Sequence, residues 1–327
     1  MILIISESTD ITTSIVVNWL NYYSTPFLRI NDFYNLKFHY QINNKTKQLY
    51  ILKQNKKYCI NDINVVWFRR FKVNSDIKFG KNTKHSLIED INRFVIQEKQ
   101  SILSLLTIEL ANKYWLNHPS QGRVNKQLQL QVANLVGLNI PATLITNSKK
   151  ELISFKKKYK SIITKPIQEA ATFVINKYSV TTFTREVLDE EIATMPEYFM
   201  PIQVQNKINK DFEIRTFFLD GKCFSMAMFT QSDVKTQIDF RNYNFDNPAR
   251  RVPYKLPLDI ENKLAKFMEI MKINCGSFDL IKTKDEKYIF LEVNPVGQFG
   301  MTSFPCNYNL EKEVALHLIN KNKYYEK

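Results

Sequence analysis

The stretch from Cys275 to Gln298 is CGSFDLIKTKDEKYIFLEVNPVGQ. Two apolar runs in it flank the polar tip KTKDEK, a pattern that predicts a β-hairpin. Folding the chain at the middle of the tip sets Asp279 opposite Glu292 and Ser277 opposite Asn294. Because residues two apart in a strand share a face, the hairpin would bring two carboxylates and one side-chain amide together.

Oxygen ligands of this kind suit magnesium, which binds a few carboxylates and completes its shell with phosphate and water. The competing interpretation is a solvated acidic face, which acids on hairpins commonly form. Two details favour the site. Both acids lie inside apolar strands rather than at the tip, and Pro295 ends the second strand directly after Asn294. The opposite face is predicted to be apolar and to carry Phe278, Leu280, Leu291 and Val293.

The order of these residues, an aspartate on one strand and E-x-N at the end of the next, resembles the metal site of the ATP-grasp ligases. The run NPVGQFGMTSFPCNYNLEKEVA that starts at Asn294 is similar to the C-terminal signature of the peptide-maturing ATP-grasp proteins. These include the microviridin-type (graspetide) macrocyclases and, with greater similarity, the grasp-with-spasm maturases. The resemblance extends over roughly Asn117 to Ala315, and it is weak in the first hundred residues. It implies that Asp279, Glu292 and Asn294 hold Mg2+ beside ATP.

The composition indicates a globular protein with a basic charge. The chain of 327 residues is long enough for two or three domains, and it is 44% hydrophobic and 24% charged. Its formal net charge of +14 fits nucleic acid, an acidic peptide or ATP. The lysines are scattered, and the longest block is Lys156 to Lys158. Compositional bias is therefore the simpler explanation, and we expect no nucleic-acid partner.

The sequence also predicts a cytoplasmic protein without a membrane partner. No apolar run approaches the ~18 residues of a membrane span. The start MILIIS predicts a first strand rather than a signal peptide, because it lacks a basic segment. The cysteines form no C-x-x-C pair, which favours reduced thiols. No histidine near Cys306 in the sequence would activate it as a nucleophile, so a structural role is favoured. The four cysteines are Cys59, Cys223, Cys275 and Cys306.

We expect an α/β fold with α+β lobes, namely an ATP-grasp fold preceded by a pre-ATP-grasp α/β domain at residues 1–116. Residues 117–200 would form the central lobe, and residues 201–327 the C-terminal lobe with the metal hairpin. The strand VVWF and the following Arg69 and Arg70 resemble the pre-ATP-grasp domain, where a salt bridge at the rim is the favoured role of the two arginines. The first domain is predicted to contain strands at Ile2–Ile5, Phe27–Ile30 and Val65–Phe68, a hairpin within Phe38–Ile51, and helices at Thr12–Tyr23 and Leu87–Leu116.

Two lysines match positions that contact ATP phosphates in the ATP-grasp proteins. The resemblance places Lys126 in the motif R-x-x-K-x-x-x-L at the start of a helix. Lys165 ends the β-branched run SIITK, where a lysine needs an anion or a carboxylate as partner. Between Lys165 and Phe173 the relatives carry a glycine-rich flap over the phosphates. This chain has PIQEAAT there, without glycine, so its flap would have to use side chains or close differently.

The run PIQVQNKI is similar to the hinge strand on which adenine lies. Recognition of adenine there uses backbone groups, which Lys207 and Ile208 would supply, with Gln205 and Asn206 beside them. Glu213 occupies the position that binds ribose in the family.

Two arginines complete the set of candidate residues. Arg215 begins the strand RTFFL, and Arg241 lies in Asp239-Phe240-Arg241-Asn242, which resembles the D-F-R-x-N of glutamate-adding relatives. The guanidinium fork suits phosphate and carboxylate, although a single arginine more often forms a surface ion pair. Their places around the hinge and the metal hairpin favour a catalytic role for both.

The resemblance implies an ATP-dependent ligase that activates Asp or Glu side chains of a ribosomally made precursor peptide as acyl phosphates. A Ser/Thr hydroxyl or a Lys amine would then close an ester or amide macrocycle, with ADP and phosphate as products. The expected partner is a precursor peptide with a leader and an acidic, Thr-rich core, and a homodimer is the candidate assembly. Two alternatives stay open: a ligase that adds free amino acids to a carboxylate, and a basic nucleic-acid-binding module with a vestigial nucleotide pocket.

Overall fold

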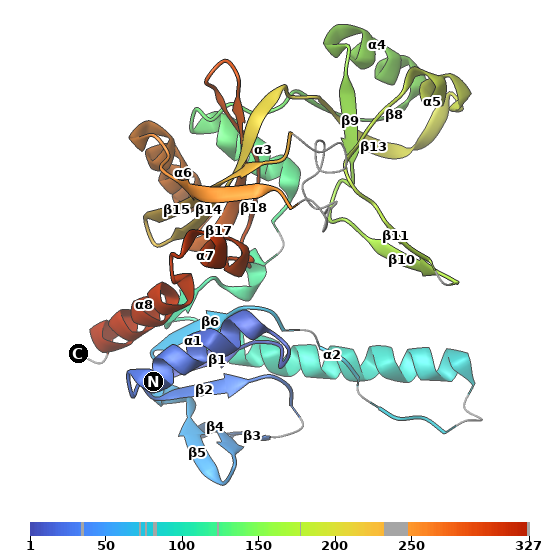
Figure 1. The fold of residues 1–327 in the computed structure, drawn as a ribbon. Coiled ribbons are helices and arrows are strands. Elements are labelled where there is room, and N and C mark those ends of the chain that lie inside the picture. Colours follow the sequence, from blue (N-terminus) through green and yellow to red (C-terminus); the bar gives the residue numbers. More distant parts are fainter. Residues whose placement is uncertain are drawn as a thin grey trace. The chain divides into compact units, whose positions relative to one another are not determined.

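The computed structural model describes residues 1–33, 36–71, 73–75, 77–80, 84–122, 124–176, 178–231 and 248–325. The chain forms two compact units, Met1–Ser120 together with Asn309–Lys327, and Gln121–Tyr308 (Figure 1). The sequence places a boundary near Asn117, close to the point where the first unit ends. The last helix, which the sequence assigns to the C-terminal lobe, lies in the first unit.

A parallel sheet in the order β2-β1-β6-β7 forms the centre of the first unit. The three strands predicted from their apolar runs have the predicted bounds. The fourth strand is formed by the last residues of the stretch Leu87–Leu116, which was predicted as one helix. The helix of the structure already ends at Glu109. The strands are β1 (Ile2–Ile5), β2 (Phe27–Ile30), β6 (Val65–Phe68) and β7 (Tyr114–Leu116). The helices are α1 (Ile11–Tyr22), α2 (His85–Glu109) and α8 (Leu310–Tyr325), and α8 packs against α1 and β6.

Arg69, at the end of β6, is 3% exposed, and its Nε lies 3.3 Å from Oδ2 of Asp10. Asp10 is the N-cap of α1 and accepts a hydrogen bond from the backbone N–H of Thr13 at 2.9 Å. The predicted salt bridge is therefore present but is buried rather than at the rim. A buried charge requires such a partner, which gives Arg69 a structural role.

A second, antiparallel sheet of the first unit contains the predicted hairpin and a third strand. Its order is β3-β4-β5, with β3 (Lys37–Ile42), β4 (Lys47–Lys53) and β5 (Lys56–Cys59). One face of this sheet packs into the core of the unit through Phe38, Leu49, Ile51 and Tyr58. A 3-10 turn at Ile60–Asp62 leads from β5 to β6.

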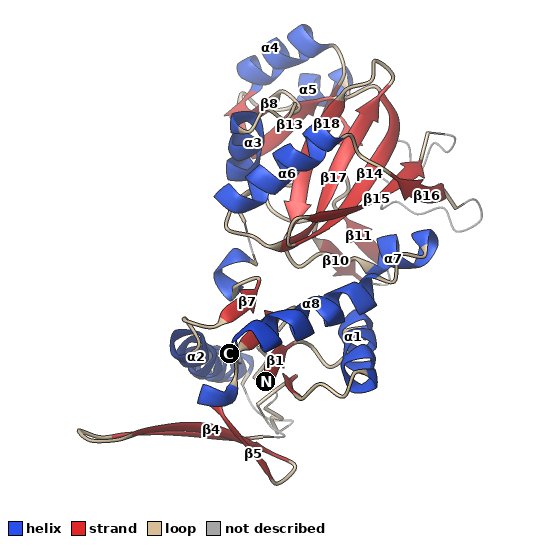
Figure 2. Ribbon diagram, turned by 90° about the vertical axis from the view of Figure 1, so that its left-hand side faces the viewer, coloured by secondary structure: helices blue, strands red, loops and turns tan. Residues whose placement is uncertain are grey.

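The described part of the second unit contains a two-stranded hairpin and two larger sheets, of which the four-stranded one has the order β12-β9-β13-β8. Helices α4 and α5 pack beside it over Leu152, Ile162, Val187, Ile192 and Val204 (Figure 2). Its strands are β8 (Thr143–Ser148), β9 (Ile162–Lys165), β12 (Arg185–Glu186) and β13 (Tyr198–Asn206), and its helices α4 (Lys149–Tyr159) and α5 (Asp189–Thr194). A separate hairpin consists of β10 (Thr172–Ile175) and β11 (Tyr178–Thr181).

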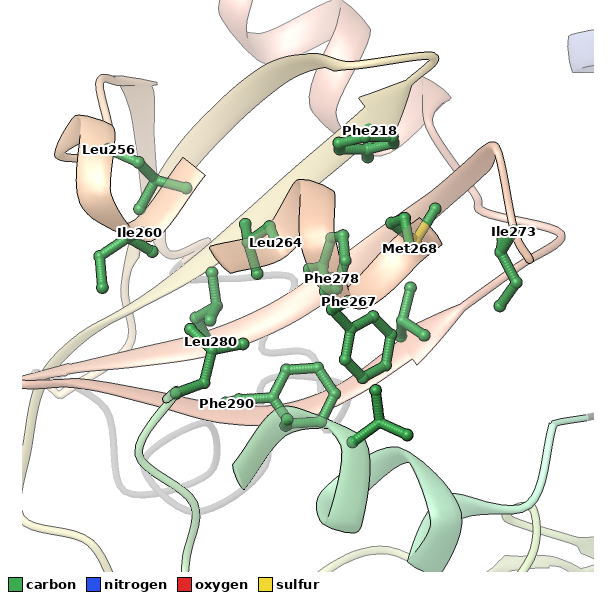
Figure 3. Packing of buried hydrophobic residues seen from close by; sticks show 14 of the residues in the cluster. Phe218, Leu256, Ile260, Leu264, Phe267, Met268, Ile273, Phe278, Leu280 and Phe290 are labelled. Carbon is green, nitrogen blue, oxygen red and sulfur yellow. The ribbon is translucent and has the colours of Figure 1, made fainter. Parts of the chain in front are cut away.

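The larger sheet has the order β16-β15-β14-β17-β18. One face packs against α3 and α6 around Phe267, Phe278 and Phe290, as Figure 3 shows. Its strands are β14 (Lys210–Leu219), β15 (Lys222–Phe229), β16 (Arg250–Tyr254), β17 (Cys275–Thr283) and β18 (Tyr288–Asn294). The helices of this part are α3 (Lys126–Leu135), α6 (Leu258–Ile270) and α7 (Gly300–Cys306).

The hairpin β17–β18 pairs Asp279 with Glu292 and Ser277 with Asn294, as predicted. Beyond Asp279 the register shifts, because Leu280 pairs with Phe290 and Leu291 is left as an extra residue. Such a bulge turns the extra side chain out of the regular alternation. Leu291 was predicted on the core face, and this prediction is wrong: the residue lines the cavity described below. None of the helices in the described ranges is long and apolar enough to cross a membrane.

Candidate functional site

A cavity of about 610 Å³ in the second unit is lined by residues of its four-stranded and its five-stranded sheet. Every predicted site residue that the structure describes contributes to this lining. Arg241 lies in the segment 232–247, outside the described residues. The predicted residues in the lining are Lys126, Lys165, Gln205, Asn206, Lys207, Ile208, Glu213, Arg215, Asp279, Glu292 and Asn294.

Arg215 and Asp279 form a bidentate ion pair between β14 and β17. These two residues are direct neighbours in the antiparallel register, and Nη1 of Arg215 donates to Oδ1 at 2.8 Å and to Oδ2 at 3.0 Å. Arg215 is 5% exposed. Its Nε is buried and finds no acceptor among the described residues. Arg215 and Asp279 both line the cavity, so the guanidinium and the carboxylate lie side by side in its wall.

Lys126 lies at the first position of α3, directly after the N-cap Asn125. Its Nζ lies 2.9 Å from Oε2 of Glu292 and 3.7 Å from Oε1 of Glu169. Buried Gln129, one turn further along α3, holds the helix against β18. Its amide donates to the carbonyl of Val293 at 3.1 Å and accepts from the N–H of Val293 at 2.8 Å. This clamp fixes Lys126 beside the exit of the metal hairpin.

The oxygen donors of the hairpin suit magnesium. Asp279 and Glu292 supply carboxylate oxygens, and Oδ1 of Asn294 accepts from the N–H of Gly297 at 3.2 Å, which orients the amide. Within the described ranges, no cluster of three or more His, Cys, Asp or Glu side chains could hold a metal. Two carboxylates and an amide fit a magnesium ion that takes its remaining ligands from phosphate and water.

Glu213 and Lys210 form a second buried ion pair at the cavity. Nζ of Lys210 donates to Glu213, which also accepts from the hydroxyl of Thr230 at 3.2 Å. Burial raises the pKa of Glu213, and Lys210 opposes this shift. Lys210 was not predicted, because residues three apart point to opposite faces of a regular strand. A register shift between Lys210 and Phe212 inserts Asp211 as an extra residue and brings the two charges together.

The side chains of Gln205 and Asn206, at the end of the hinge strand, form hydrogen bonds with other protein groups. The amide of Gln205 donates to Oγ1 of Thr143 at 2.9 Å, and Oδ1 of Asn206 accepts from the N–H of Ala142 at 2.7 Å. These bonds tie β13 to the segment that leads into β8. The hinge side chains are thereby taken up in positioning the strand, so its backbone is the part suited to meet a ligand.

Lys207 is held in the same way by β12 and the start of β9. Its Nζ lies 2.8 Å from Oε2 of Glu186, and its backbone N–H donates to the carbonyl of Ser161 at 3.0 Å. The hydrogen bond from Lys207 and another from the hydroxyl of Ser161 lower the pKa of Glu186. The backbone N–H of Lys207 is therefore already bonded, and its carbonyl is the group left to contact adenine.

The cavity wall near the hinge is apolar, and sequence reasoning missed most of it. Aliphatic side chains carry no chemical signature of a site, and Leu291 reaches the cavity only through the bulge. The segment that replaces the glycine-rich flap contributes Pro166, Glu169 and Ala170. The missed apolar residues are Pro141, Ile163, Ile281 and Leu291.

Cys306 lies in α7 and is buried in a small cluster with Met226 and Met228. Burial raises the pKa of its thiol, which disfavours the thiolate that a nucleophile needs. The structure thus supports the structural role expected for this cysteine.

Residues 1–123 match the family model described as the MvdD pre-ATP grasp domain. No curated protein sequence matches the chain. Solved structures match over almost its whole length. The RiPP-associated ATP-grasp ligase of Chryseobacterium gregarium, solved with ADP and a leader and core peptide, has a TM-score of 0.85 at 23% identity; the match covers 98% of this chain and 96% of that one.

Two further structures are similar. The macrocyclase MdnC of Microcystis aeruginosa MRC, bound with the precursor peptide MdnA, has a TM-score of 0.80 at 24% identity and matches 98% of this chain and 99% of its own. The ATP-grasp ligase PsnB, complexed with a minimal precursor, Mg and ADP, has a TM-score of 0.75 at 14% identity, with 98% and 97% covered.

These matches confirm the predicted ATP-grasp fold with a pre-ATP-grasp domain at its N-terminus. They also confirm the resemblance to peptide-maturing ATP-grasp proteins, and they extend it. The sequence resemblance is weak in the first hundred residues, yet these residues carry the match to the family model.

Proposed function

We propose that the protein is an ATP-dependent ligase that activates Asp or Glu side chains of a ribosomally made precursor peptide and closes ester or amide macrocycles. One observation carries the proposal. A single cavity gathers three cations, Lys126, Lys165 and Arg215, around the acids Asp279 and Glu292, and an apolar wall lies beside the hinge strand. A triphosphate with a base at one end has this distribution of charge and apolar surface.

The charge of each side chain determines the part of ATP or the metal ion that it binds. Lys126 and Lys165 neutralise the phosphates, and Glu213 binds the ribose, while the backbone of Lys207 and Ile208 meets the adenine between the apolar side chains. Asp279, Glu292 and Asn294 hold the Mg2+, which when bound neutralises the terminal phosphates and holds them in line for transfer. Lys126 leaves Glu292 to reach the phosphates when the nucleotide binds.

The chemistry at the substrate needs no covalent enzyme intermediate. The peptide carboxylate takes the γ-phosphoryl group of ATP and becomes an acyl phosphate, and ADP is released. A hydroxyl or amine of the same peptide then attacks the carbonyl carbon, and phosphate leaves. Arg215, which lines the cavity beside Asp279, steadies the transferring phosphoryl group, and Arg241 assists it. The precursor peptides printed for the solved relatives support a peptide as substrate.

Mass spectrometry and nucleotide analysis test the proposal. The protein is incubated with ATP, Mg2+ and a synthetic Thr- and Asp/Glu-rich peptide. We expect ADP and phosphate, and the loss of one water mass from the peptide for each ring closed. Hydroxylamine added during turnover should trap a hydroxamate on an Asp or Glu. Formation of AMP, or a peptide that gains a free amino acid, would contradict the proposal.

A further inference from the structure

The sheet β3-β4-β5 of the first unit carries a concentration of positive charge. Residues 37–59 contain six lysines and neither aspartate nor glutamate. Lys47 is paired with Glu109 at 2.7 Å, and Nζ of Lys53 donates to the carbonyl of Arg29 at 2.6 Å. Of the described carboxylates, none lies within ion-pair distance of the other four lysines. These four are Lys37, Lys45, Lys56 and Lys57.

The strand register places two of these lysines on the face that points away from the core. Lys37 on β3 and Lys57 on β5 both pair with Leu52, which lies between them on β4. The next row on this outer face is His39, Tyr50 and Cys59. Figure 1 shows the three strands at the margin of the first unit, away from α1. Lys37 and Lys57 are exposed, so the outer face presents positive charge to the solvent.

Both faces of the Tyr50 ring are already in contact with neighbouring side chains. The imidazole of His39 stacks on Tyr50 with ring centroids 4.4 Å apart and planes inclined by 16°. Nζ of Lys57 lies 4.1 Å from the same ring centroid. Two groups this close to one ring must lie on opposite sides of it. Tyr50 therefore offers no free ring face for stacking a nucleobase, which single-stranded nucleic acid would use.

We propose that the outer face of β3-β4-β5 is a docking surface for an extended, acidic segment of the peptide substrate. The inference rests on the proposed function, because the carboxylates to be activated supply the negative charge of the partner. Lys37 and Lys57 are two strands apart, a separation of about 10 Å. An extended peptide with acids at alternate positions presents carboxylates every ~7 Å on one side. The long side chains of Lys37 and Lys57 can therefore each form an ion pair with one carboxylate.

Fluorescence anisotropy of the full-length protein without ATP tests the surface. The probe is a fluorescein-labelled peptide in which Glu and Ser alternate; a Gln-Ser peptide and an oligothymidylate of equal length serve for comparison. The test variant is Lys37→Glu/Lys57→Glu. The matched control is Lys150→Glu/Lys157→Glu, which reverses the charge of two exposed lysines on α4. Both variants change the net charge by the same amount, so they separate a local site from general attraction.

We expect the outer-face variant to bind the Glu-Ser peptide at least about tenfold more weakly than the unmodified protein, and the α4 variant to bind within about twofold. We expect no binding of the Gln-Ser peptide to the unmodified protein or to either of the two variants. Equal losses in the two variants, unchanged binding by the outer-face variant, or binding of the oligothymidylate in preference to the peptide would each overturn the proposal.

A parallel assay of ADP formation keeps the two proposals apart. If the outer-face variant loses peptide binding while no peptide stimulates ADP formation, the docking surface stands and the proposed ligase function fails. If peptide does stimulate ADP formation and the outer-face variant binds it as the unmodified protein does, the ligase stands and the docking surface is refuted.

Discussion

Nζ of Lys126 lies 2.9 Å from Oε2 of Glu292, so the first residue of α3 neutralises the last carboxylate of the metal hairpin. Asp279, which lies opposite Glu292 on the hairpin, also has a cation beside it, since Arg215 pairs with Asp279. Without such partners, two partly buried carboxylates on neighbouring strands would repel one another. In the proposed site, Mg2+ and the phosphates would replace these partners, so that neither carboxylate would be left without a neighbouring cation.

The first prediction concerns Glu292. Glu292→Gln keeps the shape of the side chain but removes one of the charges proposed to hold Mg2+, so we expect a loss of ATP turnover of at least about 100-fold. The Mg2+ concentration for half-maximal activity should rise as well. The control is Asp285→Asn at the exposed tip of the same hairpin, which should turn over normally. Normal activity of the Glu292 variant at low Mg2+ would refute the metal site.

The second prediction concerns the ion pair of Arg215 and Asp279. Removing one partner leaves the other charge buried, so Arg215→Ala should lower the free energy of unfolding by about 3–5 kcal/mol. The double variant with Asp279→Ala should lose less than the sum of the two single losses, since it leaves neither charge unpaired. Urea denaturation measures all three. Arg185→Ala breaks an exposed bidentate pair with Glu191 and should cost no more than about 1 kcal/mol.

The third prediction compares Leu291 and Val293, which lie two positions apart on β18. Because of the bulge, Leu291 lines the cavity whereas Val293 lies in the core. Leu291 lines the cavity, so Leu291→Ala should raise the KM for ATP about tenfold with little effect on stability. Val293 belongs to the core, so Val293→Ala should cost on the order of 2 kcal/mol of stability and leave the KM nearly unchanged. Steady-state kinetics and thermal unfolding of the two variants provide the comparison. The reverse pattern would mean that the bulge is misplaced.

The fourth prediction concerns pH. The bonds from Lys207 and Ser161 lower the pKa of Glu186 in the folded protein below its ordinary value of 4.5. The ionised carboxylate therefore stabilises the fold above about pH 4.5, and this contribution is lost as the pH falls through the lowered pKa. Because Glu186 is partly exposed, Glu186→Gln should cost up to about 1 kcal/mol at pH 7 and nothing at strongly acid pH. Urea denaturation across this range, with the exposed Glu190→Gln as the comparison variant, checks the sign.

The fifth prediction concerns Gly297, whose φ is +52°. A Cβ there would lie 3.1 Å from Oγ of Ser277 and 3.3 Å from its backbone nitrogen. Gly221 has a φ of +91° and open space around it, so Gly221→Ala reports the backbone strain alone. Gly297→Ala should lose about 1 kcal/mol more than this control and should also reduce activity, because the N–H of Gly297 orients Asn294. Equal losses in both variants would exclude the contact.

The sequence by itself predicted the local register of the hairpin. Successive side chains of a strand alternate between its faces, so a polar tip with an even number of residues sets Asp279 opposite Glu292. The same logic found the strands at Ile2–Ile5, Phe27–Ile30 and Val65–Phe68, where continuous apolar runs mark a buried parallel sheet. The resemblance to the ATP-grasp proteins implied a set of site residues, and all of those that the structure describes line the cavity, while the apolar wall and Lys210 were missed.

The tertiary structure decided what depends on residues far apart in the chain. The bulges at Asp211 and Leu291 arise from strand pairing, and they bring Lys210 to Glu213 and Leu291 to the cavity. The helix α8 packs against α1 and β6 because its apolar face needs a partner, which no local pattern specifies. Alternation along a strand is a property of the backbone, whereas the partner of a buried charge or an apolar face is chosen by the packing of the whole fold.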